Sequence, residues 1–235
     1  MTEKRTLTTH RMLMTGLIAA VVTVLLGELP IGWAEYPLVP GDPTGLTGMM
    51  LGSAGLSLAQ LASGALFGGV CIPLQYFGFE ALARIVERSC PRAGRVMHAG
   101  ALATGFLGGI VHVVCVALMF VCRIVCTEEL TALPPAVWDF TLWLVMPVSV
   151  VFMPVYYAMT IALFIAVVRG RTVFPRWAAA LNPLAATLVI NALPLLLPGS
   201  ALVNALGMAN MGIGSVLTFG GLLALLPREE PADRT

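Results

Sequence analysis

Two ionisable side chains that could carry chemistry lie inside apolar runs of this sequence. Glu28 stands in GELPIGW and His112 in GGIVHVVC. In hydrocarbon an ionisable side chain costs free energy, so it usually faces the interior of a helix bundle. A carboxyl group that meets an imidazole there exchanges protons or orients a ligand. We therefore take Glu28 and His112 as a candidate pair for ligand binding or proton exchange.

Four further polar residues lie in apolar runs near the expected depth of this pair. Asn191, Asn204 and Asn210 fall in the outer halves of the last two expected membrane segments, and Tyr156 falls at mid-depth in the fourth. A shared layer is typical of a cavity that opens outward. In the alternative interpretation these amides only join helices, and each adds about 0.6–2 kcal/mol. We add all four residues to the predicted ligand-binding set.

A stripe of soft metal ligands follows His112. His112, Cys115, Met119, Cys122 and Cys126 are spaced 3, 4, 3 and 4, which places them on one helix face. Such a set could pass copper(I). However, the stripe spreads over about 20 Å of helix, whereas one ion needs ligands that converge on one point. Cys and Met also pack as pliable apolar residues. We therefore expect a packed seam, with no metal and no other cofactor.

Hydrolase motifs are missing from the sequence. The chain has three histidines and no HExxH, GxSxG or paired intramembrane aspartates. A metal-free enzyme that acts on a lipid or isoprenoid, with Glu28 and His112 as acid and base, stays an alternative. We expect a binding or transport protein rather than an enzyme. A non-catalytic assembly subunit is the second alternative.

The composition predicts the elements that must position these residues. The chain has 235 residues, of which 58% are hydrophobic and 11% charged, whereas a soluble domain carries about a quarter charged residues. The solvent of its surface is therefore lipid. A spanning helix needs roughly 20 apolar residues. Six segments qualify, although the second could form two spans: about 12–33, 47–83, 96–122, 138–168, 177–197 and 200–226.

The basic residues predict the orientation. If the N-terminus lies in the cytoplasm, the 13 Lys and Arg residues all fall on the cytoplasmic side of the membrane except Arg123, which falls on the opposite side. The positive-inside rule favours this arrangement. An odd number of spans would place the C-terminal arginines outside. We therefore expect six transmembrane helices with both termini cytoplasmic.

Small residues recur at four-residue spacing in two segments. Gly64 and Gly68 are such a pair, and Gly100, Thr104 and Gly108 continue the pattern in the next segment. In lipid, small residues let helices approach closely. We expect packing within the chain, with a homodimer seam along these Gly-rich faces as the alternative. The other expected partners are membrane lipids and a small apolar or amphipathic ligand. Nucleic acid is not expected, because no basic cluster is interleaved with aromatic residues.

Several motifs together resemble a known family. They are GELPIGW, IPLQYFGF (72–79), GGIVHVVC (108–115), GRTVFPRW (170–177) and LVNALGMANMGIGSVLTFGGLL (202–223). In order and spacing this chain is similar to DUF6796, a bacterial family of uncharacterised multi-pass membrane proteins. The resemblance implies a bundle of six to seven helices and brings no established activity. In that family an aspartate commonly stands where this chain has Glu28. The resemblance highlights Glu28, Trp33, Pro73, His112, Pro175, Trp177, Asn204 and Gly220.

The sequence thus predicts an all-α, polytopic membrane helical bundle. We expect one integral membrane domain over residues 1–235, with a disordered tail at 227–235, in a bacterial inner (cytoplasmic) membrane. Its expected function is to bind or transport a small, partly apolar molecule in a cavity in the outer half of the membrane.

Overall fold

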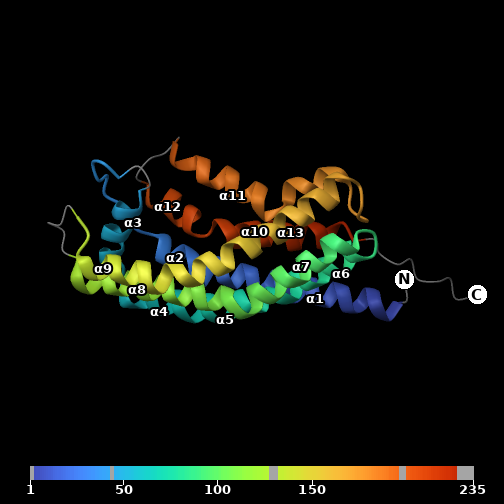
Figure 1. Cartoon of the computed structure of the whole chain (residues 1–235), viewed down its shortest axis with the longest axis horizontal. Coiled ribbons are helices and arrows are strands. Elements are labelled where there is room, and N and C mark those ends of the chain that lie inside the picture. Colours follow the sequence, from blue (N-terminus) through green and yellow to red (C-terminus); the bar gives the residue numbers. More distant parts are fainter. Residues whose placement is uncertain (1–2, 43–44, 127–131, 196–199, 227–235) are drawn as a thin grey trace, which may run out of the picture.

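The described part of the chain is built from helices alone. The computed structural model describes residues 3–42, 45–126, 132–195 and 200–226, and all regular structure in these ranges is helical. The helices form one elongated bundle (Figure 1). The all-α fold is thereby confirmed for these ranges. The predicted disordered tail, 227–235, lies outside the described residues.

Four helices are long and apolar enough to cross a membrane. They cover Thr8–Gly32, Leu58–Glu87, Pro91–Val125 and Pro135–Val168. Each contains one π-helical turn between α-helical parts. The parts are α1 (Glu3–Val22), Thr23–Glu28 and α2 (Leu29–Gly32); α4 (Leu58–Ser63), Gly64–Gly68, α5 (Gly69–Leu74) and α6 (Tyr76–Glu87); α7 (Pro91–Ala103), Thr104–Gly108 and α8 (Gly109–Val125); and α9 (Pro135–Phe140), Thr141–Val145 and α10 (Met146–Val168).

A further apolar stretch is broken in the middle. The helices α12 (Ala201–Met208) and α13 (Asn210–Ala224) meet at Ala209 with a bend of 62°, and together they are long and apolar enough for one span. A shorter apolar helix, α11 (Pro183–Ala192), precedes them. The described residues therefore hold four continuous helices of spanning length, or five if the broken pair is one span.

Two expected segments are interrupted in the structure. In segment 47–83, a short helix α3 (Leu46–Gly52) and a 3-10 turn (Ser53–Gly55) end in extended backbone, and Ser57 then starts α4 with a capping box to Gln60. The long helix therefore begins at Leu58. The sequence contains a sign of this helix start, because Ser-x-x-Gln before an apolar run is typical of a helix N-terminus.

The expected segment 177–197 is likewise not one helix. It consists of a 3-10 turn (Arg176–Leu181), α11 and a 3-10 turn (Leu193–Leu195). Pro183 and Pro194 lack the N–H that a continuous helix needs. The 10 residues of α11 reach about 15 Å, which is half the thickness of the hydrocarbon.

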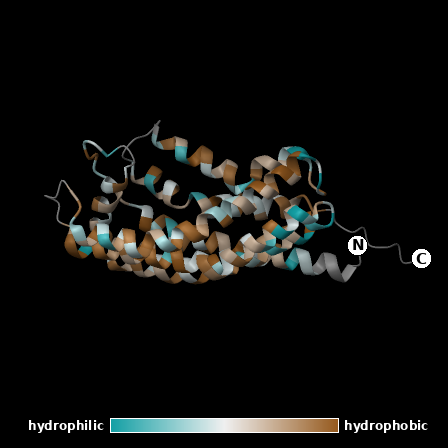
Figure 2. Cartoon of the chain, in the orientation of Figure 1, coloured by the Kyte–Doolittle hydropathy of each residue, from teal (hydrophilic) through white to brown (hydrophobic). Residues whose placement is uncertain are grey.

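The charged connections gather at one end of the bundle. Figure 1 places the start of α1, the end of α13 and the α6–α7 and α10–α11 connections at the same end. Figure 2 shows hydrophilic residues gathered at these connections and hydrophobic residues along the middle. Arg123 lies near the other end, where its guanidinium donates to the carbonyl of Leu56. The two ends therefore carry the charge asymmetry that the sequence predicted.

The core packs around closely approaching glycines. Phe79 of α6 and Phe219 of α13 are fully buried, and their rings meet edge to face at 4.8 Å. Beside them α1 touches α6, because a Cβ atom on Gly16 would lie 2.6 Å from the Cα of Gly78. Such an approach is possible only without a side chain at Gly16.

This contact predicts that Gly16→Ala destabilises the bundle. Alanine is favoured over glycine in a helix by about 1 kcal/mol. The added methyl group would nevertheless collide with backbone, and overpacking of this kind costs about 1–3 kcal/mol. We expect a lower melting temperature in detergent. The matched control is Gly220→Ala, whose Cβ would meet Leu17 at an ordinary 3.5 Å. Equal melting temperatures for the two variants would contradict the proposed contact.

Candidate functional site

The six side chains predicted as a site line one cavity. The cavity has a volume of about 710 Å³, and its wall includes Glu28, His112, Tyr156, Asn191, Asn204 and Asn210. They come from the first, third and fourth long helices, from α11 and from the broken pair α12–α13. The cavity reaches the surface at the loop after α2, where Leu38 is 87% exposed. The structure brings the six residues together, and their role stays a prediction.

Glu28 ends the π-helical turn of the first span and is buried. Its Oε2 atom is shielded and has no hydrogen-bond partner. The carboxylate rests on the backbone of Gly212, since a Cβ atom there would lie 2.1 Å from Oε2. Gly212 belongs to the first turn of α13, yet no amide of that turn donates to Oε2. A buried polar atom without a partner is an exception in native proteins and calls for an explanation.

Tyr156 places a second unpartnered polar atom on the wall. Its hydroxyl group is buried without a hydrogen bond. Ser215 lies beside it. Its hydroxyl group donates to the carbonyl of Met211 at 3.1 Å, and its oxygen could still accept, but no hydrogen bond from Tyr156 reaches it. Glu28 is close enough to Tyr156 to act on it electrostatically. The two unpartnered groups therefore belong to the same region of the cavity.

His112 is bonded to backbone rather than to Glu28. Its Nε2 atom lies 3.1 Å from the carbonyl oxygen of Gly64, and this edge of the ring packs against Gly68. Among the described residues no hydrogen bond or ion pair joins His112 to Glu28. The two residues share the cavity, as expected, but they do not form a bonded pair. A small residue at Gly68 is required, because a Cβ atom there would overlap the imidazole.

The three asparagines hold the broken helix pair. Asn204 donates to the carbonyl of Ala34 at 2.8 Å, which ties α12 to the end of α2. Asn210 donates to the carbonyl of Gly207 at 2.7 Å and to Oδ1 of Asn191 at 3.2 Å. The carbonyl of Gly207 lies at the C-terminal end of α12, where helical donors run out. These amides therefore act as packing links and line the cavity at the same time.

Sequence reasoning missed several wall residues. Gln75 of the second long helix lines the cavity and donates to Oγ1 of Thr23 at 3.3 Å. The sequence feature that could have indicated a cavity residue here is the position of Gln75, two residues after Pro73. Tyr36, in the loop after α2, also lines the cavity, and burial raises its pKa to about 12. Nothing in the local sequence around Tyr36 predicted that it would be buried.

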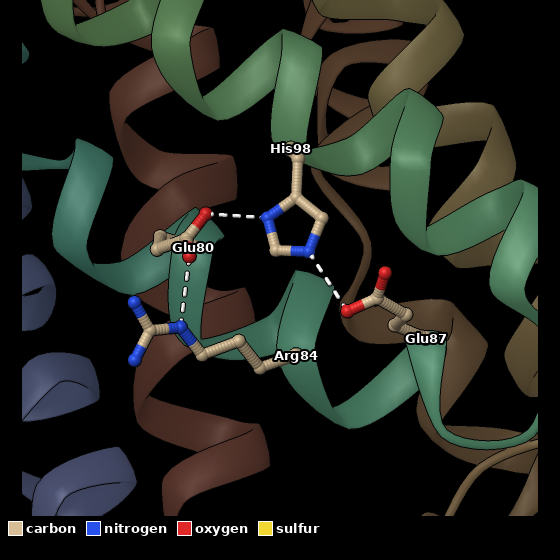
Figure 3. Close-up of polar contacts among 4 residues, drawn as sticks. All are labelled: Glu80, Arg84, Glu87 and His98. Atoms are coloured by element: carbon tan, nitrogen blue, oxygen red, sulfur yellow. Dashed lines mark hydrogen bonds and ion pairs between the residues drawn. The ribbon is translucent and has the colours of Figure 1, made fainter.

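A separate polar cluster lies at the end of the bundle that holds the chain ends. In Figure 3 the ring of His98 on α7 points between two carboxylates of α6. Its Nδ1 lies 2.6 Å from Glu80 and its Nε2 lies 3.3 Å from Glu87, while Arg84 contacts Glu80 at 2.8 Å. The sequence analysis did not predict this contact between Glu80 and His98. This cluster joins the two helices of the α6–α7 hairpin.

The soft-ligand stripe and the small residues pack within the chain. Cys122 and Cys126 lie in an apolar cluster with Met50 and Leu118. Within the described ranges no group of three or more His, Cys, Asp or Glu side chains could hold a metal ion. A Cβ atom on Gly100 would overlap Met159. The glycine pattern is therefore explained by intramolecular contacts, whereas the homodimer seam stays a prediction.

Comparison with known proteins finds a family but no characterised relative. A family model matches residues 1–229, and its description is a family of unknown function (DUF6796). No curated protein and no solved structure matches the chain.

The unpartnered phenol predicts the effect of Tyr156→Phe. The substitution removes a buried hydroxyl group that has no hydrogen bond, so its desolvation cost of about 1–3 kcal/mol disappears. We expect the melting temperature in detergent to rise or stay equal. Tyr157→Phe is the matched control, because Tyr157 is half-buried and is not on the cavity wall. A clear loss of stability in Tyr156→Phe alone would show that the hydroxyl group has a partner.

Proposed function

The chain belongs to DUF6796, a family whose function is unknown, and we propose that it binds or transports a small, partly apolar molecule in the cavity around Glu28. The observation that carries the proposal is a cavity of about 710 Å³ whose wall holds three shielded polar atoms without partners, on Glu28, Tyr36 and Tyr156. Ligand pockets occupy about 300–1,000 Å³ and combine apolar walls with a few placed polar groups.

The rest of the wall fits such a ligand. Its apolar part includes Ile31, Val111, Phe152 and Met153. Met supplies a surface that adapts to ligands of different shape. A bound polar group would give Glu28 and Tyr156 the hydrogen bonds that the protein does not provide.

The broken helix supports the same location. Gly207 and Met208 before the break and Asn210 after it all line the cavity. Irregular backbone at membrane depth is tolerated where it is buried in protein or lines a cavity. Discontinuous helices of this kind also form substrate sites in transporters. The break therefore supports binding at this place.

The proposal includes an orientation in the membrane. We infer six crossings in a bacterial inner membrane, with α11 and its flanking turns as one of them and both termini in the cytoplasm. The two chain ends lie at one end of the bundle, beside the arginine-bearing connections (Figure 1). Trp33 and Trp143, both more than half exposed, belong to elements at the other end, and exposed tryptophans favour the membrane interface.

A cavity-filling variant tests the binding function. A Cβ atom on Gly207 would meet nothing within 4 Å, so Gly207→Trp can fill the cavity without displacing backbone. In lipid nanodiscs we expect the unmodified protein to bind the fluorescent probe 1-naphthylmethanol saturably. We expect Gly207→Trp to lose this binding and to keep its melting temperature.

The matched control is Gly55→Trp. Gly55 also has open space around its Cβ position, and it lies outside the cavity wall. It adds the same indole and should leave probe binding unchanged. Equal binding by all three proteins, or no saturable binding by the unmodified one, would refute a site in this cavity.

The orientation has a separate test. Leu38→Cys, introduced together with Cys90→Ser, should react with a membrane-impermeant maleimide added to intact spheroplasts. Leu38 is 87% exposed, and it belongs to the loop between α2 and α3, which lies at the end of the bundle opposite the start of α1 (Figure 1). In the unmodified chain, Cys90 in the α6–α7 connection should react only after the membrane is permeabilised. The reverse pattern of labelling would show that the termini face outward.

A further inference from the structure

Four side chains on the cavity wall bond through a donor and keep an acceptor. The opposite holds for Asn191, whose oxygen accepts from Asn210. The phenols of Tyr36 and Tyr156, which have no partner among the described residues, still carry a donor.

The first of the four is His112. The Nε2 atom of His112 faces the carbonyl of Gly64, which can only accept. The proton of the ring must therefore lie on Nε2, and in the neutral imidazole Nδ1 is then an acceptor. Because the Nε2 edge packs against Gly68, Nδ1 lies on the opposite edge of the ring.

The amides repeat this pattern. Asn204 gives an N–H to the carbonyl of Ala34, and Asn210 gives both of its N–H groups to Gly207 and Asn191. Carbonyl partners fix which end of each amide is the nitrogen. The side-chain oxygens of Asn204 and Asn210 have no donor among the described residues. Each therefore remains a free acceptor.

Gln75 also bonds through a donor and keeps its side-chain oxygen as an acceptor. The hydroxyl group of Thr23 donates to the carbonyl of Ala19 at 2.9 Å, so its oxygen must accept from Nε2 of Gln75. The side-chain oxygen of Gln75 then remains without a donor among the described residues. A third wall amide thus offers an acceptor.

The carboxyl group of Glu28 has no cationic partner on the described part of the wall. The described residues that line the cavity include Glu28 but neither lysine nor arginine. A carboxylate in an apolar wall is stable only if a paired charge and further hydrogen bonds satisfy it. Since the protein supplies neither to Oε2, Glu28 is a carboxylate only when a bound ligand brings the paired charge and the donors.

We propose that the ligand is a lipophilic primary amine bound as its ammonium ion, with the charge against Glu28 and the apolar body along Met153, Phe152 and Val111. A primary ammonium group has three donors and no acceptor, which complements Glu28 and the free acceptors of His112, Asn204, Asn210 and Gln75. An anion would meet the charge of Glu28, and an alcohol would bring one donor only. This inference rests on the proposed binding function of the cavity.

A matched set of naphthalene probes tests the ligand class in nanodiscs. 1-Naphthylmethylamine offers charge and donors, its N,N,N-trimethyl derivative offers charge alone, 1-naphthylmethanol offers one donor, and 1-acetonaphthone offers only an acceptor. We expect the primary amine to bind about tenfold more tightly than the alcohol, because charge-assisted hydrogen bonds are about twice as strong as neutral ones. We expect the trimethyl derivative to lose most of this advantage.

The variant Glu28→Gln assigns the preference to one side chain. It should bring the affinity for the amine down to that for the alcohol and leave alcohol binding within about threefold. The ranking of the four probes needs only the unmodified protein, so it decides the question even if the variant fails to fold. Three outcomes would overturn the inference while the cavity remains a binding site. The ketone or the alcohol could bind most tightly, or the trimethyl derivative could bind as tightly as the amine. The third such outcome is an amine preference that survives in Glu28→Gln. Loss of binding for all probes would instead refute the proposed function.

Discussion

The fold depends on supplying donors to backbone carbonyls that lose their helical partners in hydrocarbon. Lipid offers no donor, so the protein must provide one. Pro30 has no N–H for the carbonyl of Leu26, and the hydroxyl group of Ser63 donates to that carbonyl at 2.5 Å. The carbonyl of Pro30 itself accepts from Gln60 at 2.8 Å. These bonds fasten the first span to the second, and they show why polar side chains face inward at this depth.

The same requirement shapes the cavity. The break at Ala209, which frees carbonyls, is flanked by residues of the cavity wall, and the π-helical turn Gly64–Gly68 accepts a bond from a wall residue. His112 donates to the carbonyl of Gly64 in a π-helical turn, and Asn210 donates to the carbonyl of Gly207 at the break. Each such bond uses a donor and leaves an acceptor. The acceptor-rich character of the wall is therefore a by-product of how the irregular backbone is satisfied.

The sequence predicted the composition of the site better than its bonding. Depth along apolar segments brought Glu28, His112 and the asparagines into one layer, because depth follows from the rise of a helix. Their partners are set by side-chain rotamers and by contacts far apart in the chain, such as Asn204 with Ala34. For the same reason Glu80 and Glu87 gave no sign of His98 on the neighbouring helix. The interrupted segment 177–197 was misjudged because apolar length outweighed Pro183 and Pro194.

The packing below the cavity bears on whether the bundle binds or transports. Tyr156 lines the cavity, and its ring contacts Phe79 at 6.0 Å, which in turn packs on Phe219. Both phenylalanines are fully buried, and the ring of Phe219 lies against Gly78, where a Cβ atom would approach it to 2.6 Å. This aromatic group separates the cavity from the cluster around His98. A ligand could pass toward that end only if α6 and α13 moved apart and broke these close contacts. The geometry thus describes one state, open to the end of the bundle that carries the α2–α3 loop, and transport would require a second packing of these two helices.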